Sequence, residues 1–102
     1  MEFEWDERKN LANQAKHGVS FEQAVRIFEH PTLTAADDRF AYGEVRLISI
    51  GMISIGLMND GQYLTVVHTE RDVRIRIISA RPSSRQERKR YEQALREALD
   101  RR

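Results

Sequence analysis

Three segments in the second half of the chain alternate apolar and polar side chains, the pattern of strands with one buried face. They are Val45–Met58, Gln62–Glu70 and Val73–Arg81. Turn signals separate them at Asn59-Asp60-Gly61 and at Arg71-Asp72. Because short turns join successive strands, antiparallel pairing is favoured. The pattern therefore predicts a three-stranded antiparallel meander.

The N-terminal segment predicts a short strand followed by a helix. Phe3–Trp5 alternates apolar and polar positions. Asp6 is a favourable N-cap for a helix from Glu7 to Lys16, because its carboxylate accepts hydrogen bonds from free backbone N–H groups. Gly18 is the expected end of this helix, since glycine adopts a positive φ without a Cβ clash.

A second helix is predicted between Ser20 and Pro31. Ser20 and Gln23 fit a capping box, and the residue before Pro31 avoids helical angles. Helical spacing puts four apolar side chains on one face: Phe21, Ala24, Val25 and Phe28. The next segment, Thr32–Gly43, is rich in Thr, Asp and Gly and is predicted to be a loop.

A C-terminal helix is predicted after Pro82, which ends the sheet. Ser84 with Glu87 fits another capping box. The helix continues to near Leu99 and has an apolar stripe of Tyr91, Ala94, Leu95, Ala98 and Leu99. With 102 residues the chain is long enough for one domain. We therefore expect a single α+β domain over residues 1–102: a short strand, two helices, the meander and a C-terminal helix.

Two neighbouring five-residue segments of the first long strand nearly repeat each other. Ile48–Met52 reads ISIGM, and Ile53–Leu57 reads ISIGL. Strand side chains have a period of two, so an offset of five turns the second copy to the opposite face unless a bulge corrects it. The repeat predicts a β-bulge at Gly51 or Gly56, where glycine favours one.

Charge is distributed unevenly along the chain. Residues 1–70 carry six Lys/Arg and eleven Asp/Glu, whereas residues 71–102 carry eleven and five. A basic patch attracts phosphate backbones or an acidic protein partner, and composition leaves both open.

Other features restrict the class of protein. No cysteine is present, which excludes thiol chemistry and Cys-bound zinc. The acidic, aromatic N-terminus is unlike a signal peptide, and the longest apolar stretch, Leu47–Met58, is too short and polar to span a bilayer. We therefore expect a cytoplasmic protein without membrane association.

The basic strand Val73–Arg81 is the most informative segment for binding. Arg74 and Arg76 are expected on one face, about 7 Å apart, near the phosphate spacing of an extended nucleic-acid strand. Arginine also pairs with phosphate through two donors. Alternation puts Ile78 and Ala80 on this arginine side, and it puts Val73, Ile75 and Ile77 on the core side. The alternative is ion pairing of the arginines with Glu70 or Glu44.

Proton-transfer candidates lie at the end of the preceding strand. His68 and Glu70 are two residues apart and share a face, and histidine suits proton transfer near neutral pH. A structural hydrogen-bonding role for His68 is the alternative. Lys16 and His17 complement the dipole at the end of the first helix, which explains them structurally.

If the chain is an enzyme, its available groups are arginine, lysine, histidine and glutamate, and these fit metal-independent RNA cleavage. Three scattered histidines give no metal-ligand spacing, so no metal or cofactor is expected. In such a cleavage a base activates the 2′-hydroxyl, cations hold the phosphate, and an acid protonates the leaving oxygen.

Five segments in a fixed order resemble the BrnT family of toxins, and together they cover the chain from Phe3 to about Tyr91. They are Phe3-Glu4-Trp5-Asp6, Lys16-His17-Gly18-Val19-Ser20-Phe21-Glu22, Val66-Val67-His68-Thr69-Glu70-Arg71, Ile75-Arg76-Ile77-Ile78-Ser79-Ala80-Arg81, and the group Arg85, Glu87, Arg88 and Tyr91. One departure is the turn after Arg71, where the family usually has glycine and this chain has Asp72-Val73.

The resemblance implies a RelE-like fold and an endoribonuclease of the mRNA interferase type. Such a protein is the toxin of a bacterial type II toxin–antitoxin pair, and it cleaves RNA and inhibits translation and growth. The implied partner is a BrnA-type antitoxin with a ribbon-helix-helix part, in a heterotetramer that contacts operator DNA mainly through the antitoxin. The alternative is a non-catalytic binding module that acts as antitoxin partner and co-repressor.

On this interpretation the candidate catalytic residues are Lys16, His17, His68, Glu70, Arg76 and Arg81, and the candidate RNA-binding residues are Arg71, Arg74 and Arg85. His68 or Glu70 would transfer protons. Arg76 and Arg81 would stabilise the phosphorane-like transition state. On an ideal strand these two arginines face opposite sides, so a shared site requires a twist or a bulge.

Overall fold

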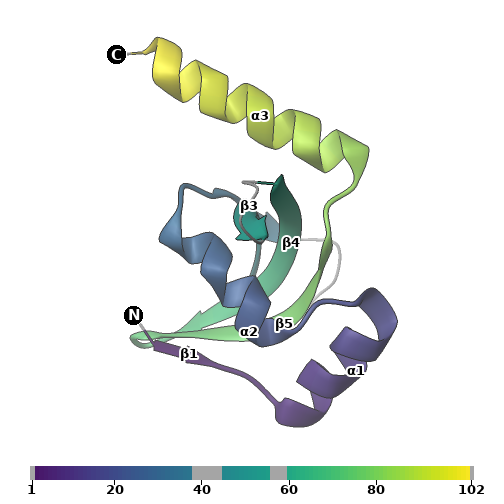
Figure 1. Cartoon of the computed structure of the whole chain (residues 1–102). Coiled ribbons are helices and arrows are strands. Elements are labelled where there is room, and N and C mark those ends of the chain that lie inside the picture. The colour runs from purple at the N-terminus through teal and green to yellow at the C-terminus, as the bar shows by residue number, and fades with distance from the viewer. Residues whose placement is uncertain (1, 38–44, 56–59, 102) are drawn as a thin grey trace.

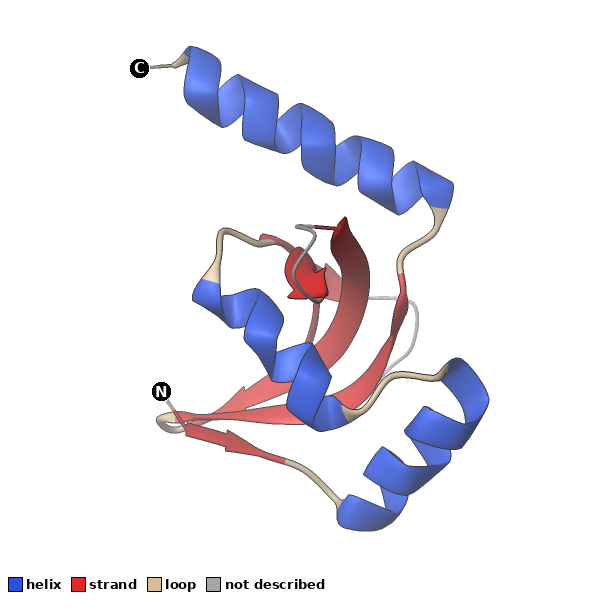
Figure 2. Ribbon diagram, in the orientation of Figure 1, coloured by secondary structure: helices blue, strands red, loops and turns tan. Residues whose placement is uncertain are grey.

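The computed structural model describes residues 2–37, 45–55 and 60–101. They form a five-stranded mixed sheet with the strand order β1-β5-β4-β3-β2, together with three α-helices and one 3₁₀ helix (Figures 1 and 2). In chain order the elements are β1 (Glu2–Glu4), α1 (Glu7–His17), α2 (Phe21–Ala24), the 3₁₀ helix η1 (Val25–Glu29), β2 (Leu33–Asp37), β3 (Arg46–Ile55), β4 (Asp60–Arg71), β5 (Arg74–Pro82) and α3 (Arg85–Asp100).

The sheet confirms the α+β class but has more strands than expected. β3, β4 and β5 are antiparallel neighbours in chain order. Two further strands extend them: β1 pairs parallel with β5, and β2 pairs antiparallel with β3. The prediction of a loop over Thr32–Gly43 is therefore wrong for Leu33–Asp37. This short segment has little alternation, and it becomes a strand because the edge of β3 offers its backbone a partner.

The helix termini follow the predicted caps. Asp6 accepts hydrogen bonds from the backbone of Arg8 and Lys9, and Gly18 ends α1 at a φ of 71°. Both capping boxes are formed, at Ser20 and at Ser84. The prediction of one continuous second α-helix is wrong, since α2 tightens into the 3₁₀ helix η1 after Ala24. Helical spacing alone does not distinguish these two winding patterns over so short a segment.

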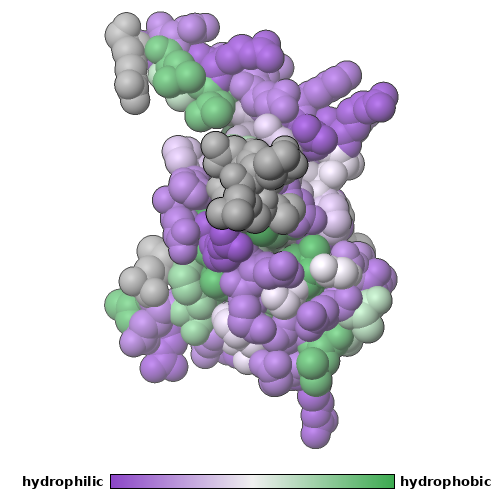
Figure 3. All heavy atoms as spheres, in the orientation of Figure 1, coloured by the Kyte–Doolittle hydropathy of each residue, from purple (hydrophilic) through white to green (hydrophobic). Residues whose placement is uncertain are grey.

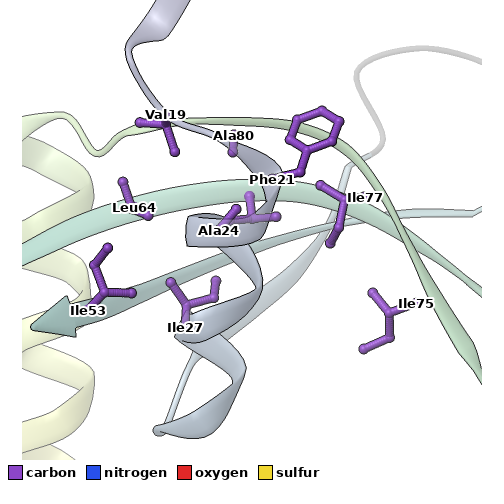
Figure 4. Close-up of a cluster of buried hydrophobic side chains, with 10 residues drawn as sticks. Val19, Phe21, Ala24, Ile27, Ile53, Leu64, Ile75, Ile77 and Ala80 are labelled. Atoms are coloured by element: carbon purple, nitrogen blue, oxygen red, sulfur yellow. The ribbon is translucent and has the colours of Figure 1, made fainter. Parts of the chain in front are cut away.

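One side of the sheet, which we call the core face, carries Leu64, Ile75 and Ala80 and packs against α2 and η1. Phe21, Ala24 and Ile27 from these helices are fully buried against it. Figure 4 shows their side chains pointing toward Leu64, Ile77 and Ile53 of the sheet.

Helix α1 is joined to β5 by a buried amide. The Asn13 side chain accepts a hydrogen bond from the backbone N–H of Ala80 (3.1 Å) and donates one to its carbonyl (2.7 Å). It donates another to the Val19 carbonyl (2.9 Å). β1 pairs only with residues 74–76 of β5. The Asn13 amide therefore takes the place of a neighbouring strand beside Ala80.

A register shift interrupts the pairing of β4 and β5. Val67 lies opposite Ser79 and His68 opposite Ile77, so Ile78 is the extra residue. The shift reverses the alternation beyond it, which puts Ala80 in the core and contradicts its predicted place on the arginine side. The alternation also predicts Val73 on the core side, which is wrong. Val73 lies in the turn before β5 and is 77% exposed.

The bulge predicted at Gly51 is absent. β3 pairs with β4 in one regular register from Leu47 to Ile55, and Gly56 lies outside the described residues. Gly51 has another role: a Cβ at this position would lie 2.7 Å from Cβ of Ile27. The glycine allows η1 to pack closely on β3.

Replacing Gly51 by alanine is therefore expected to destabilise the protein by about 1–3 kcal/mol through overpacking. Gly61→Ala is the matched control, because its Cβ would meet the end of the flexible Met52 side chain, whereas a Cβ at Gly51 would meet Cβ of Ile27, which cannot move without the backbone of η1. Urea unfolding of both variants measures the difference. An equal effect of the two substitutions would contradict the close packing of η1 on β3.

The turn between β4 and β5 is formed without glycine. Asp72 has a φ of 55°, a conformation that aspartate and asparagine tolerate better than most residues. β4 therefore continues through Arg71, and β5 begins at Arg74. The departure from the family pattern at this turn leaves the hairpin intact.

Helix α3 lies across one end of the molecule (Figure 1) and contacts β4 and β5 through its first half. Of its predicted apolar stripe only Tyr91 is buried, and its hydroxyl donates to the Pro31 carbonyl (2.8 Å). Leu95 and Leu99 are 38% and 53% exposed, and Figure 3 shows hydrophobic spheres on this half of the helix. Among the described residues, no helix combines the length and apolarity needed to cross a membrane.

Candidate functional site

The side of the sheet opposite the core face carries a row of arginines, Arg71, Arg74, Arg76 and Arg81, and we call it the arginine face. Arg71 lies opposite Arg74 across the β4–β5 ladder, and Arg76 follows Arg74 by two residues. The extra residue Ile78 changes the alternation, so Arg81 faces the same side as Arg76. The bulge thus brings Arg76 and Arg81 to the same face, which a site shared by the two arginines requires.

Carboxylates of β1 lie beside this row. Arg74 Nε is 3.1 Å from Glu2 Oε2 and Arg74 Nη1 is 4.0 Å from Glu4 Oε2, while Arg76 Nη1 is 3.8 Å from the same Glu4 oxygen. Ion pairing of the arginines, the alternative to phosphate binding, is therefore present, but with Glu2 and Glu4. The expected partner Glu70 points to the core side, and Glu44 lies outside the described residues.

Arg81 is held differently from Arg76. Its two terminal nitrogens bind both oxygens of Glu87, at 2.7 and 3.0 Å, which is a bidentate pair between β5 and α3. Burial raises the pKa of the Glu87 carboxyl, but hydrogen bonds from Arg81 and from the Ser84 backbone outweigh burial and lower the pKa to about 2. Both terminal nitrogens of Arg81 thus donate to Glu87.

The low pKa of Glu87 predicts a loss of stability in acid. In the unfolded chain this carboxyl takes up a proton near pH 4.5, whereas in the folded protein it does so near pH 2. Its stabilising contribution is present above pH 4.5 and is lost as the pH falls toward 2. We expect Glu87→Gln to be less stable than wild type at pH 7 and to lose less stability between these values.

Urea unfolding between pH 2 and pH 7 measures this difference. Glu97→Gln, on the exposed side of α3, is the matched control and should follow the wild-type curve. A Glu87→Gln curve parallel to that of wild type would show that the pair with Arg81 does not lower this pKa.

A basic hollow lies at the beginning of α3, next to the arginine face. It is lined by Ser83, Arg85, Arg88, Lys89 and Glu92. The Arg88 guanidinium stacks 4.6 Å from the centre of the Tyr63 ring, and Tyr63 donates to Glu92 at 3.1 Å. The hollow places Arg85, the third predicted RNA-binding arginine, beside further cationic side chains.

His68 lies on the core face, on the opposite side of the sheet from the arginines. It is 2% exposed, and the Phe28 ring packs edge-on against it at 5.1 Å. Its Nε2 atom is 2.8 Å from Ser49 Oγ, which is 2.7 Å from Thr34 Oγ1. Burial lowers the pKa of His68, and the nearby Glu70 opposes this in part. These contacts correspond to the structural role that we kept as the alternative.

The remaining candidates do not pair with the arginine row. Glu70 shares the core side with His68 and is exposed at the end of β4. Lys16 and His17 occupy the last turn of α1, and within the described part of the chain no hydrogen bond or ion pair joins either of them to Arg74, Arg76 or Arg81. Of the predicted catalytic residues, the structure places Arg76 and Arg81 on one face.

Sequence reasoning missed Glu4 as a residue of this face. The signal was weak, because nothing in the alternation of Phe3–Trp5 indicates that β1 pairs with β5 in parallel. The pairing puts Glu4 opposite Arg76.

No group of three or more potential metal-binding side chains gathers within residues 2–37, 45–55 and 60–101.

Comparison with protein families gives one match. The model of a family described as "Ribonuclease toxin, BrnT, of type II toxin-antitoxin system" matches residues 5–87. The match includes α1, α2, every strand from β2 to β5, and the start of α3. A search of curated proteins finds no match.

Proposed function

Because the chain belongs to the BrnT family of ribonuclease toxins from type II toxin–antitoxin systems, we propose that it is a metal-independent endoribonuclease whose arginine face binds the RNA. Membership of the family implies an RNA substrate and an antitoxin partner. The location of the site, its mechanism and the identity of the antitoxin are the parts that we propose.

The observation that supports this site best is the loose pairing of Arg76. Its nearest carboxylate oxygen is 3.8 Å away, beyond the 2.7–2.9 Å of a charge-assisted hydrogen bond. The guanidinium is therefore able to offer donors to a phosphate, whereas Arg81 already donates twice to Glu87. We assign stabilisation of the developing phosphorane charge to Arg76, and support of the same face to Arg81 together with Glu87.

Flanking phosphates would follow the row of basic side chains. Arg74 lies next to Arg76 and is 57% exposed. The basic hollow with Arg85 lies at the other end of β5. Arg76 and Arg81 are separated by five positions of an extended strand, about 15 Å, so each suits a different phosphate. Arg71 would contribute from the end of β4.

The biological part of the proposal concerns growth inhibition and its control. Cleavage of messenger RNA would inhibit translation and arrest bacterial growth. A BrnA-type antitoxin with a ribbon-helix-helix part would cover the arginine face in a heterotetramer and contact operator DNA. An acidic segment of the antitoxin suits this face, because opposite charges guide association.

The test is cleavage of a synthetic RNA by the purified chain in the presence of EDTA. We expect a 2′,3′-cyclic phosphate end and a 5′-hydroxyl end, and no cleavage where the nucleotide before the cut is 2′-deoxy. Loss of cleavage in EDTA, or cleavage of the 2′-deoxy substrate, would contradict the proposal.

The second candidate function is the non-catalytic binding module. The burial of His68 favours it, since this residue cannot reach an RNA bound on the opposite side of the sheet. Expression without an antitoxin distinguishes the two functions. Growth arrest with loss of RNA supports the enzyme, and harmless high-level expression supports the module.

A further inference from the structure

A ribonuclease of the proposed kind requires a proton acceptor on the arginine face, and the two residues expected from the sequence lie elsewhere. His68 is buried on the core face, and Glu70 points to the same side. A general base has to come within hydrogen-bonding distance of the proton that it removes. The acceptor therefore has to be sought among the carboxylates beside the arginines.

We infer that Glu4 is the general base of the RNA cleavage, and this inference rests on the proposed function. β1 pairs with β5 so that Glu4 lies opposite Arg76. The same carboxylate oxygen is 3.8 Å from Arg76 Nη1 and 4.0 Å from Arg74 Nη1. A phosphate bound by these two guanidinium groups would have the Glu4 carboxylate next to it.

The neighbouring carboxylates are less suitable. Glu2 is at the outer end of β1, its side chain is 68% exposed, and it binds Arg74 directly at 3.1 Å. Both carboxylate oxygens of Glu87 already accept hydrogen bonds from Arg81. The Glu4 side chain is 28% exposed, so it is partly shielded from water and still accessible to a substrate.

The step is an internal transesterification without a redox change. The Glu4 carboxylate takes the proton of the 2′-hydroxyl while the 2′-oxygen forms a bond to phosphorus. The bond from phosphorus to the 5′-oxygen breaks, and this oxygen takes a proton from water. Glu4 then returns its proton to water. The products are a 2′,3′-cyclic phosphate and a 5′-hydroxyl, and Arg76 stabilises the charge on the phosphate oxygens in between.

The experiment is a rate–pH profile of RNA cleavage by wild type, Glu4→Gln and Glu4→Asp under single-turnover conditions. Glu2→Gln is the matched control, because it removes the same charge from the same face of the same strand. We expect Glu4→Gln to lose about 100- to 10,000-fold in rate, and to lose the decline of the rate at low pH that an ionising base produces. Glu4→Asp should keep this decline at a reduced rate, and Glu2→Gln should remain within a few-fold of wild type.

Three results would overturn the assignment while leaving the proposed function intact. The first is a Glu4→Gln variant that cleaves RNA at the wild-type rate. The second is a Glu4→Gln rate that is lower at every pH with the acid decline unchanged, which would make Glu4 a positioning residue for Arg76 and Arg74. The third is loss of the acid decline in Glu70→Gln instead. A wild-type chain that does not cleave RNA would instead contradict the proposed function itself.

Discussion

Replacing Arg76 by alanine is expected to lower the rate of RNA cleavage by about 100- to 1000-fold, the loss that follows removal of one donor to transition-state charge. The reason is geometric. The Arg76 guanidinium is 30% exposed, lies beside Glu4 and is only loosely paired with it. Its donors are free to strengthen their bonds as negative charge develops on the phosphate. The effect should therefore appear in kcat, with a smaller change in KM.

Two comparisons separate this role from simple loss of positive charge. Arg74→Ala removes a charge from the same face and should mainly raise KM, because we assign Arg74 to a flanking phosphate. Arg96→Ala removes a charge from the exposed side of α3 and should change neither constant by more than a few-fold. If Arg76→Ala and Arg81→Ala both keep wild-type cleavage, the arginine face is not the active site.

The sequence predicted the local parts of the fold well, because those parts depend on neighbouring residues. Asp6, Ser20 and Ser84 cap their helices by hydrogen bonds that span two or three residues. The alternation of Gln62–Glu70 puts Leu64 and Val66 on one face of the strand, and the structure buries both side chains fully in the core. In each case the residues that determine the structure lie within one turn or one hairpin of each other.

The errors that affect the candidate site concern pairing between distant segments. β2 forms because the edge of β3 is available to it, and the parallel pairing of β1 with β5 depends on where α1 and α2 return the chain. Neither is encoded within the strand itself. The extra residue at Ile78 is a further case: Ile75–Ala80 shows no glycine or proline that would indicate a bulge, yet the register shifts there.

These long-range features decide the composition of the candidate site. Strict alternation would place Arg81 and Arg76 on opposite faces of the sheet, and the bulge brings them to one face. Pairing of β1 adds Glu4 to this face. The same alternation placed His68 and Glu70 together, which is correct, but it could not show that their shared side is the one covered by Phe28. The sequence therefore predicted the residues of the arginine face, but it did not predict Glu4, which joins them only through the pairing of β1.

The largest effect on stability is expected at Asn13. Replacing it by alanine removes three hydrogen bonds and leaves the N–H and carbonyl of Ala80 and the carbonyl of Val19 without their partners. Both Ala80 and Val19 are almost fully buried. A buried polar group without a partner costs about 1–3 kcal/mol. We expect a loss of about 2–4 kcal/mol in the free energy of unfolding, a large part of the stability of a domain of this size.

Urea unfolding of Asn13→Ala, Asn13→Asp and Gln14→Ala tests this role. Gln14 is the exposed neighbour in α1, and its substitution should cost less than about 0.5 kcal/mol, as is usual on a surface. Asn13→Asp should also destabilise at pH 7, because its carboxylate can accept from the Ala80 N–H but faces the carbonyls of Ala80 and Val19 without a donor. The aspartate variant distinguishes hydrogen bonding from packing, since it nearly conserves the shape of the side chain. An Asn13→Asp variant as stable as wild type would show that the amide fills space beside β5 without replacing a neighbouring strand.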